Sequence, residues 1–227
     1  MRTALLYDAD GAMNSLIQNV STELADEIRS IGHLRSYSEG AEIFAAGDPA
    51  GFLPIVVTGR VKMVKFLEPG KEVIAGIFGE GEIFAIPPVI DGGNYPATAI
   101  AMDQTKLLLL DRVDFLRLMN DYPEFQGGIM ARMCGVMRDQ VAMIHNLATS
   151  SPEHRIINVL IKLVNGDASA KPVKIMLRRE DIAKMAGLTT ETTIRVIRRL
   201  SDKGLIVIDR GKIVVGDVET LKRAVES

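Results

Sequence analysis

The chain has 227 residues, of which 47% are apolar and 25% are charged, and its formal net charge is −2. This length and apolar content suffice for two modest globular domains, each with its own core. The composition excludes a disulfide framework and an iron–sulfur cluster within one chain, because Cys134 is the single cysteine, and no apolar run reaches the roughly 18 residues of a membrane span.

The small net charge hides an uneven distribution of charge along the chain. Residues 1–150 contain 12 Lys and Arg against 19 Asp and Glu, whereas residues 151–227 contain 15 against 10. A basic segment on an acidic body favours a polyanion as the partner of that segment. Met1 and Arg2 are not followed by a secretory leader, so we expect a cytoplasmic protein with no membrane partner.

The first part of the chain changes from an aperiodic lead-in to a region of short strands. Residues 1–20 show no period, and a short helix is predicted from about Ser21 because Leu24, Ile28 and Ile31 fall on one face. Many short segments follow, separated by turn residues, and they predict an antiparallel β-roll in a sensor domain over residues 21–120. The predicted strands are Glu42–Ala45, Leu53–Val57, Val61–Phe66, Val73–Ile77, Glu82–Ile86, Ala97–Met102 and Lys106–Leu110.

A short helix is predicted at Arg112–Met119, and a long one from Pro123 to about Thr149. Apolar residues in the long helix recur at steps of four and three, which is the spacing of a coiled-coil seam, so residues 121–149 are predicted to form a dimerisation helix. A second apolar line lies beside this seam and allows one face to pack on the β domain; an ordinary core helix is the alternative. The predicted dimer interface consists of Ile129, Met133, Val136, Gln140, Met143 and Leu147.

Residues 150–227 show the pattern of a small helical domain with a β-hairpin. A helix starts at Ser150-Ser151-Pro152-Glu153, with Pro in its first turn, and continues through Arg155–Val164. The remaining predicted elements are a strand at Val173–Leu177, helices at Arg179–Ala186 and Thr190–Lys203, a hairpin of Leu205–Ile208 and Ile213–Val215, and a last helical segment at Val218–Val225.

The helix pair around Gly187 carries the sharpest functional signal. Gly187 permits a tight turn and Thr189 can cap the second helix. The second helix turns Thr193, Val196, Ile197 and Leu200 to one face and Glu191, Ile194, Arg195, Arg198 and Asp202 to the other. Such a helix can enter the DNA major groove, where Arg forks onto guanine, Glu accepts from the cytosine amino group and the tip of Ile194 meets a thymine methyl.

The alternative interpretation of this helix is a solvated amphipathic helix with a Glu191–Arg195 salt bridge. The basic turn Arg210-Gly211-Lys212 favours DNA, because it lies where a wing would touch phosphate.

From about residue 21 to its end, the chain resembles the Crp/Fnr family of transcription regulators. The resemblance is carried by the glycine-punctuated roll, the dimer helix and the segment from Leu177 to Arg195. It implies that Glu191 and Arg195 read bases and that Arg179 clamps a phosphate. Two positions depart from the family pattern: Arg178 replaces a helix-opening Thr, and Ile194 replaces a small or hydroxyl-bearing reader. The predicted DNA-contacting residues are Arg179, Thr189, Thr190, Glu191, Thr192, Ile194, Arg195, Arg198, Arg210 and Lys212.

The resemblance also indicates what the sensor does not bind. Members that bind cyclic AMP use a Gly-Glu pair and an Arg-Ser pair, and the matching places here hold Ala85-Ile86 and Tyr95-Pro96. A cyclic phosphate would lose its charge-assisted bonds, so cyclic AMP is not expected as the effector. The predicted effector pocket, an apolar crevice between roll and dimer helix, is lined by Phe84, Ile86, Tyr95, Pro96, Met133 and Met137.

The effector itself stays open, with haem, and hence nitric oxide or another gas, as the alternative implied by similar redox- and gas-sensing branches. His33, His145 and His154 are the only histidines that could ligate haem iron. A cysteine-ligated iron–sulfur cluster is not expected, because Cys134 stands alone.

Together these features predict an α+β protein with an N-terminal antiparallel β-roll (a double-stranded β-helix like that of cyclic-nucleotide-binding domains), a dimer helix and a C-terminal winged helix-turn-helix. The predicted function is a ligand-, redox- or gas-responsive transcription regulator that binds an inverted-repeat operator in double-stranded promoter DNA as a homodimer and contacts RNA polymerase. The alternative is a cyclic-nucleotide-binding signalling module that does not read promoters. No enzymatic activity and no metal site are expected, since no Ser/His/Asp set, paired carboxylates, phosphate loop or metal cluster stands out.

Overall fold

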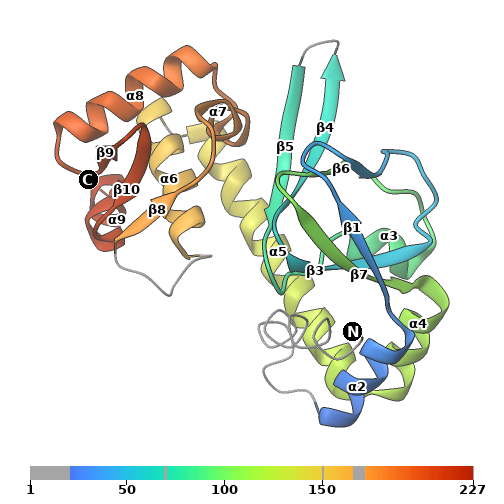
Figure 1. The fold of residues 1–227 in the computed structure, drawn as a ribbon. Coiled ribbons are helices and arrows are strands. Elements are labelled where there is room, and N and C mark those ends of the chain that lie inside the picture. Colours follow the sequence, from blue (N-terminus) through green and yellow to red (C-terminus); the bar gives the residue numbers. More distant parts are fainter. Residues whose placement is uncertain (1–20, 69–70, 150, 166–171, 227) are drawn as a thin grey trace. The chain divides into compact units, whose positions relative to one another are not determined.

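The structure is a computed structural model that describes residues 21–68, 71–149, 151–165 and 172–226 (Figure 1). The chain divides into two compact units, residues 1–137 and 138–227, which we call the N-terminal and C-terminal units. The division falls inside one long helix. The predicted lead-in, residues 1–20, lies outside the described residues.

The N-terminal unit contains two antiparallel sheets. Their strand orders are β1-β7-β3 and β2-β6-β4-β5. In the first sheet the central strand β7 pairs with both neighbours, and Leu108 lies opposite Leu34 on one side and Ile55 on the other. The predicted α+β class and antiparallel roll are confirmed. The elements of this unit are α2 (Thr22–Ile31), β1 (His33–Tyr37), β2 (Glu42–Phe44), β3 (Phe52–Thr58), β4 (Val61–Glu68), β5 (Lys71–Phe78), α3 (Ile86–Asp91), β6 (Thr98–Ala101), β7 (Thr105–Asp111), α4 (Arg112–Asp121) and the start of α5 (Pro123–Thr149).

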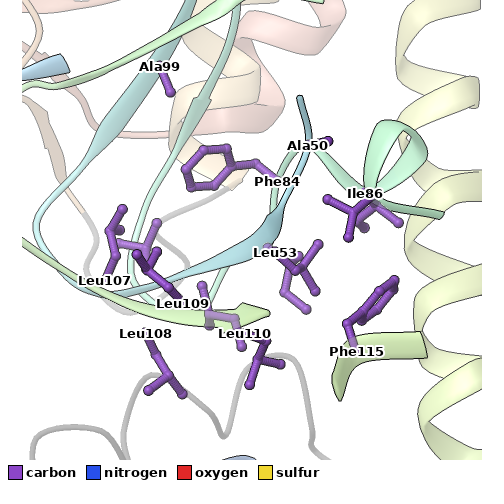
Figure 2. Packing of buried hydrophobic residues seen from close by; sticks show 14 of the residues in the cluster. Ala50, Leu53, Phe84, Ile86, Ala99, Leu107, Leu108, Leu109, Leu110 and Phe115 are labelled. Carbon is purple, nitrogen blue, oxygen red and sulfur yellow. The ribbon is translucent and has the colours of Figure 1, made fainter. Parts of the chain in front are cut away.

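The core of the N-terminal unit forms around β7 (Figure 2). Leu107 to Leu110 are four consecutive buried leucines, the pattern of a strand that is covered on both faces. The helices contribute Leu24 and Ile28 from α2, Phe115 from α4 and Ile129 from α5 to the same cluster. The roll and these helices therefore share one apolar core.

Two elements of the roll differ from the sequence prediction. Strand β1 was not predicted, because four of its five residues are exposed and its sequence does not alternate. The predicted strand Glu82–Ile86 is wrong: Ile83 forms one isolated bridge to Ile55, and helix α3 then begins at Ile86. A short apolar run that is buried gives no period from which strand and helix can be distinguished, and Pro in the first turn of α3 favours a helix start.

Ala85, just before α3, has a left-handed backbone with φ 57° and ψ 31°. A side chain in this region costs about 1–2 kcal/mol relative to the right-handed conformation, whereas glycine adopts it freely. We therefore expect Ala85→Gly to raise the free energy of unfolding by about 1 kcal/mol, measured by urea denaturation. The control is Ala46→Gly, at an exposed alanine that is absent from the positive-φ residues. Equal effects of the two substitutions would contradict this explanation.

The C-terminal unit packs helices against a small antiparallel sheet of order β8-β10-β9. Its core includes Ile157 and Leu160 from one helix, Leu200 from another and Ile213 from the central strand. The strand prediction Val173–Leu177 is two residues too long, and the other predicted elements are confirmed to within about two residues at their ends. The elements are α6 (Pro152–Asn165), β8 (Val173–Ile175), α7 (Arg179–Ala186), α8 (Thr190–Asp202), β9 (Val207–Asp209), β10 (Lys212–Val215) and α9 (Val218–Glu226).

None of the helices in the described part of the chain is long and apolar enough to cross a membrane.

Candidate nucleic-acid interface

The turn between α7 and α8 is fixed by local hydrogen bonds. Gly187 ends α7 in the left-handed conformation, with φ 60°, which a residue with a side chain adopts only with strain. Thr189 caps α8, since its hydroxyl accepts a hydrogen bond from the amide of Thr192 at 3.2 Å. Arg155 of α6 donates to the carbonyl of Gly187 at 2.9 Å and holds the turn from outside. The predicted helix-turn-helix geometry is thus present, and Arg155 is a supporting residue that the sequence did not indicate.

Helix α8 is strongly two-sided. Thr193, Val196, Ile197 and Leu200 are buried, while Glu191, Ile194, Arg195 and Arg198 are exposed. Within the described residues, the side chains of Glu191, Arg195 and Arg198 form no hydrogen bond or ion pair. The Glu191–Arg195 salt bridge of the alternative interpretation is therefore not formed. These charged groups are available for a partner.

Two other cations of α8 and its C-terminal end, Arg199 and Lys203, form ion pairs with α6. Arg199 lies 3.6 Å from Glu153 of α6, and Lys203, just after α8, also pairs with Glu153. The hydrogen bond from Lys203 lowers the pKa of the Glu153 carboxyl below its ordinary value. Glu153 therefore anchors the end of α8, whereas Arg195 and Arg198 stay unpaired among the described residues. The spacing of residues along α8 predicts which of them share a face. It could not predict the contact with Glu153, because Glu153 precedes α8 by some 40 residues in the sequence.

The predicted wing is a tight hairpin between β9 and β10. Its turn residues, Arg210 and Gly211, both have positive φ values (46° and 78°), as in a type I′ turn. Arg210 is exposed and Lys212 is half-buried. Arg179, predicted to clamp a phosphate, donates instead to the carbonyl of Gly211 at 3.1 Å, and burial lowers the pKa of its guanidinium. This contact braces the wing against α7.

The two remaining predicted DNA-contacting threonines, Thr190 and Thr192, lie half-buried in the first turn of α8. The hydroxyl of Thr192 also accepts a hydrogen bond from the hydroxyl of Thr189 at 3.0 Å. The structure therefore gathers Thr189, Thr190 and Thr192 at the start of α8.

The residues predicted to form the effector pocket fall into two groups. Phe84, Ile86 and Tyr95 are buried in the core of the N-terminal unit, and Met133 packs against that core. Pro96 and Met137 are exposed. The six residues are therefore not gathered as the lining of one crevice.

Tyr95 fills the roll where the resemblance would place a phosphate-binding Arg. Its ring stacks on Phe44 with a centroid distance of 3.6 Å, and Phe44 lies 6.1 Å from the ring of Phe84. The Tyr95 hydroxyl donates to the carbonyl of Phe52 at 2.6 Å. Burial raises the pKa of Tyr95 to about 12, so it is a neutral donor at physiological pH.

Haem finds no matching ligand set in the described part of the chain. The side chain of His33 is 70% exposed on the edge strand β1, 3.9 Å from Asp111. His154 is half-buried in the first turn of α6, and the side chain of His145 lies outside the described residues. No group of His, Cys, Asp or Glu that could hold a metal ion occurs among the residues described.

The predicted dimer seam needs a correction. Ile129 is fully buried in its own unit and Met133 packs on the same core, so this face of α5 serves the roll. The second predicted apolar line consists of Met130, Met137, Val141 and Ile144; the first three are exposed, and the side chain of Ile144 lies outside the described residues. Cys134, between Met130 and Met137, is also exposed. Val136 and Gln140 are also exposed, whereas the side chains of Met143 and Leu147 lie outside the described residues. Periodicity showed two apolar lines but could not decide which of them the roll covers.

An ion pair that the sequence did not indicate links α5 to the roll. Arg132 lies 2.7 Å from Glu82, and the other oxygen of Glu82 accepts from the amide of Gly79 at 2.8 Å. Glu82 therefore ties the turn after β5 to α5.

Comparisons with known proteins cover both units. A model of the cyclic nucleotide-binding domain matches residues 34–122, and a model of the Crp-like helix-turn-helix domain matches residues 154–224. The chain is 27% identical over 207 residues to the cyclic AMP receptor protein of Thermus thermophilus, covering 91% of this chain and 94% of that protein. It is 28% identical over 199 residues to the transcriptional activator protein anr of Pseudomonas aeruginosa, covering 85% and 79%.

The solved structure of FixK2 from Bradyrhizobium japonicum has the same fold. Its TM-score is 0.77 at 23% identity, with 85% of this chain and 96% of that chain covered.

The two matched models decide between the interpretations of the sequence. A nucleotide-binding module without DNA reading would not need a Crp-like helix-turn-helix, which is present here and exposes Glu191, Arg195 and Arg198 on α8. The cyclic nucleotide-binding domain precedes it on the same chain. From these matches, the chain belongs to the Crp/Fnr family of DNA-binding transcription regulators.

Proposed function

We propose that this regulator acts in the cytoplasm as a homodimer, with α8 of each subunit in the major groove of an inverted-repeat operator in promoter DNA. The observation that carries the proposal is the exposed face of α8, where Glu191, Arg195 and Arg198 have no partner among the described residues. Unpaired charges on a helix held firmly by its opposite face are what base reading requires.

Each exposed group has a distinct expected role. Arg195 forks onto guanine, and Glu191 accepts from a cytosine amino group. Arg198, Arg210 and Lys212 neutralise DNA phosphates, and the threonines at the start of α8 contact the sugar–phosphate backbone of the DNA. Arg179 contributes chiefly by holding the wing, because its guanidinium already bonds Gly211.

The first test is selection of binding sites from random duplex DNA with the full-length protein, followed by shift assays at several salt concentrations. We expect an enriched inverted repeat whose half-site centres lie about 34 Å, or one helical turn, apart. Affinity for it should fall as salt rises, because phosphate contacts release counterions. Binding that depends on salt but enriches no sequence would contradict the proposal.

The dimer is proposed to form along the outward face of α5. Met130, Cys134 and Met137 follow at steps of four and three residues and are exposed. An exposed apolar line at this spacing is suited to pairing with the same line of a second copy. The half-sites of the operator would then be bound by two subunits related by a two-fold axis, and RNA polymerase is the expected partner of the DNA-bound dimer.

Cys134 allows a direct test of this seam, because it is the single cysteine of the chain. We expect a short bis-maleimide cross-linker to convert the wild type into a covalent dimer, since the two Cys134 side chains would face each other near the two-fold axis. The Cys134→Ser variant should give no covalent dimer. In a matched control, Cys134→Ser combined with Ser36→Cys places the thiol on the exposed strand β1 and should not cross-link. Light scattering that shows a monomer at micromolar concentration would contradict the dimer.

The sensor is proposed to respond to a ligand, redox or gas signal other than cyclic AMP. This is supported by Ile86 and Tyr95, which are packed in the core at the places where a Glu and an Arg would hold the nucleotide. We expect calorimetry to show no micromolar binding of cyclic AMP to the wild type. Micromolar binding would overturn this part of the proposal and leave DNA binding untouched.

A further inference from the structure

Ile194 is an apolar residue in the middle of the polar face of α8. It is 39% exposed, whereas the other apolar residues Val196, Ile197 and Leu200 of this helix are buried. Its neighbours on the exposed face are Glu191, one turn before it, and Arg198, one turn after it. A partner that binds the charged groups of this face therefore also covers the side chain of Ile194.

The charges around Ile194 indicate which kind of partner can cover it. An apolar protein surface placed over Ile194 would also desolvate Glu191, Arg195 and Arg198 without pairing them, which is costly. The major groove of DNA instead offers hydrogen-bonding base edges and, at thymine, a single apolar group, the C5 methyl. It can satisfy the charged side chains and the isoleucine at once.

We propose that Ile194 is a specificity-determining residue that reads the C5 methyl of one thymine in each operator half-site. This inference rests on the proposed major-groove binding by α8 and goes beyond it. The thymine lies beside the base pairs read by Glu191 and Arg195, because Ile194 follows Glu191 by one turn and is next to Arg195 on the helix. The branched side chain encloses the methyl group and has no donor or acceptor with which to prefer another base edge.

The experiment removes only the methyl group from the DNA. The thymines of the selected operator are replaced by uracil one position at a time, with the equivalent thymines of the two half-sites replaced together. Binding of the full-length protein to each operator is measured by fluorescence anisotropy. At one thymine per half-site we expect uracil to weaken the wild type about fourfold per half-site, the effect of losing one buried methyl group. Ile194→Ala should bind the thymine and uracil operators alike. Ile194→Val should retain part of the discrimination.

A second DNA substitution separates the methyl group from the rest of the base. At the sensitive position, a 5-methylcytosine–guanine pair should be bound more tightly than a cytosine–guanine pair by the wild type but not by Ile194→Ala. Val207→Ala is the protein control, since Val207 is an exposed apolar residue of β9 outside α8 and should leave the uracil effect unchanged. Thermal unfolding checks that each variant is folded.

Three results would overturn the inference. An operator with no uracil-sensitive thymine, or equal sensitivity in Ile194→Ala, would refute methyl reading while leaving DNA binding intact. A uniform loss of affinity over all sequences in Ile194→Ala would place the side chain against the sugar backbone. Failure to select any DNA sequence would remove the proposed function and this inference together.

Discussion

Arg195→Ala is expected to weaken operator binding by about 1–3 kcal/mol, a loss of roughly 5- to 150-fold in affinity. Arg195 is exposed on α8 and has no ion-pair partner among the described residues, so it can place its guanidinium on a guanine without breaking a contact of the free protein. A bidentate contact reads one base pair, and the loss should therefore appear at a single base pair of each half-site. Shift assays on operators substituted one base pair at a time measure this directly.

Arg223→Ala is the matched control, because it removes the same charge from an exposed position on α9. It should lower affinity only slightly and at all sequences alike, through the general electrostatic attraction to DNA. Arg195→Lys keeps the positive charge but loses the two-pronged guanidinium contact. It should therefore show the salt dependence of the wild type without its base preference. If Arg195→Ala keeps the affinity and base preference of the wild type, α8 does not enter the groove as proposed. The roles proposed for Glu191 and Ile194 would then be contradicted as well.

Tyr95→Ala is expected to lower the free energy of unfolding of the N-terminal unit by about 3–5 kcal/mol, the usual cost of removing a buried aromatic ring. The substitution removes the ring stacked on Phe44 and the hydrogen bond to the carbonyl of Phe52, and leaves a cavity inside the roll. A loss of this size is a large fraction of the stability of an ordinary domain. Urea denaturation of the full chain, followed by circular dichroism, measures it.

Tyr95→Phe separates the ring from its hydroxyl. It keeps the stacking on Phe44 and should cost only about 1–2 kcal/mol, for the carbonyl of Phe52 that loses its donor. Tyr95→Arg should destabilise strongly, because a guanidinium would replace the buried ring that contacts Phe44 and Phe52. A stable Tyr95→Ala variant would show that the ring is not part of the packed core and would reopen the roll as a ligand site.

Several elements were predictable from the sequence because one local signal dominates each of them. Helix α5 begins at Pro123 and ends at Thr149 as predicted, since its apolar spacing continues for many turns with one polar interruption, at Gln140. Helix α8 was also predictable, from the cap at Thr189 and the apolar spacing that follows. Strand β1 and helix α3 were not, because an exposed edge strand has no apolar alternation and a short buried run fits either structure.

Local patterns predict the kind of each unit and the face of α8 that points outward, because periodicity and capping act between residues close in the chain. Three features follow only from the folded chain: the apolar line of α5 that the roll covers, the packing of Tyr95 inside the roll and the hydrogen bond from Arg179 to the wing. Each of these depends on residues tens of positions away. Packing and hydrogen bonds at such separations are set by how the elements fold onto one another, and no local pattern contains that information.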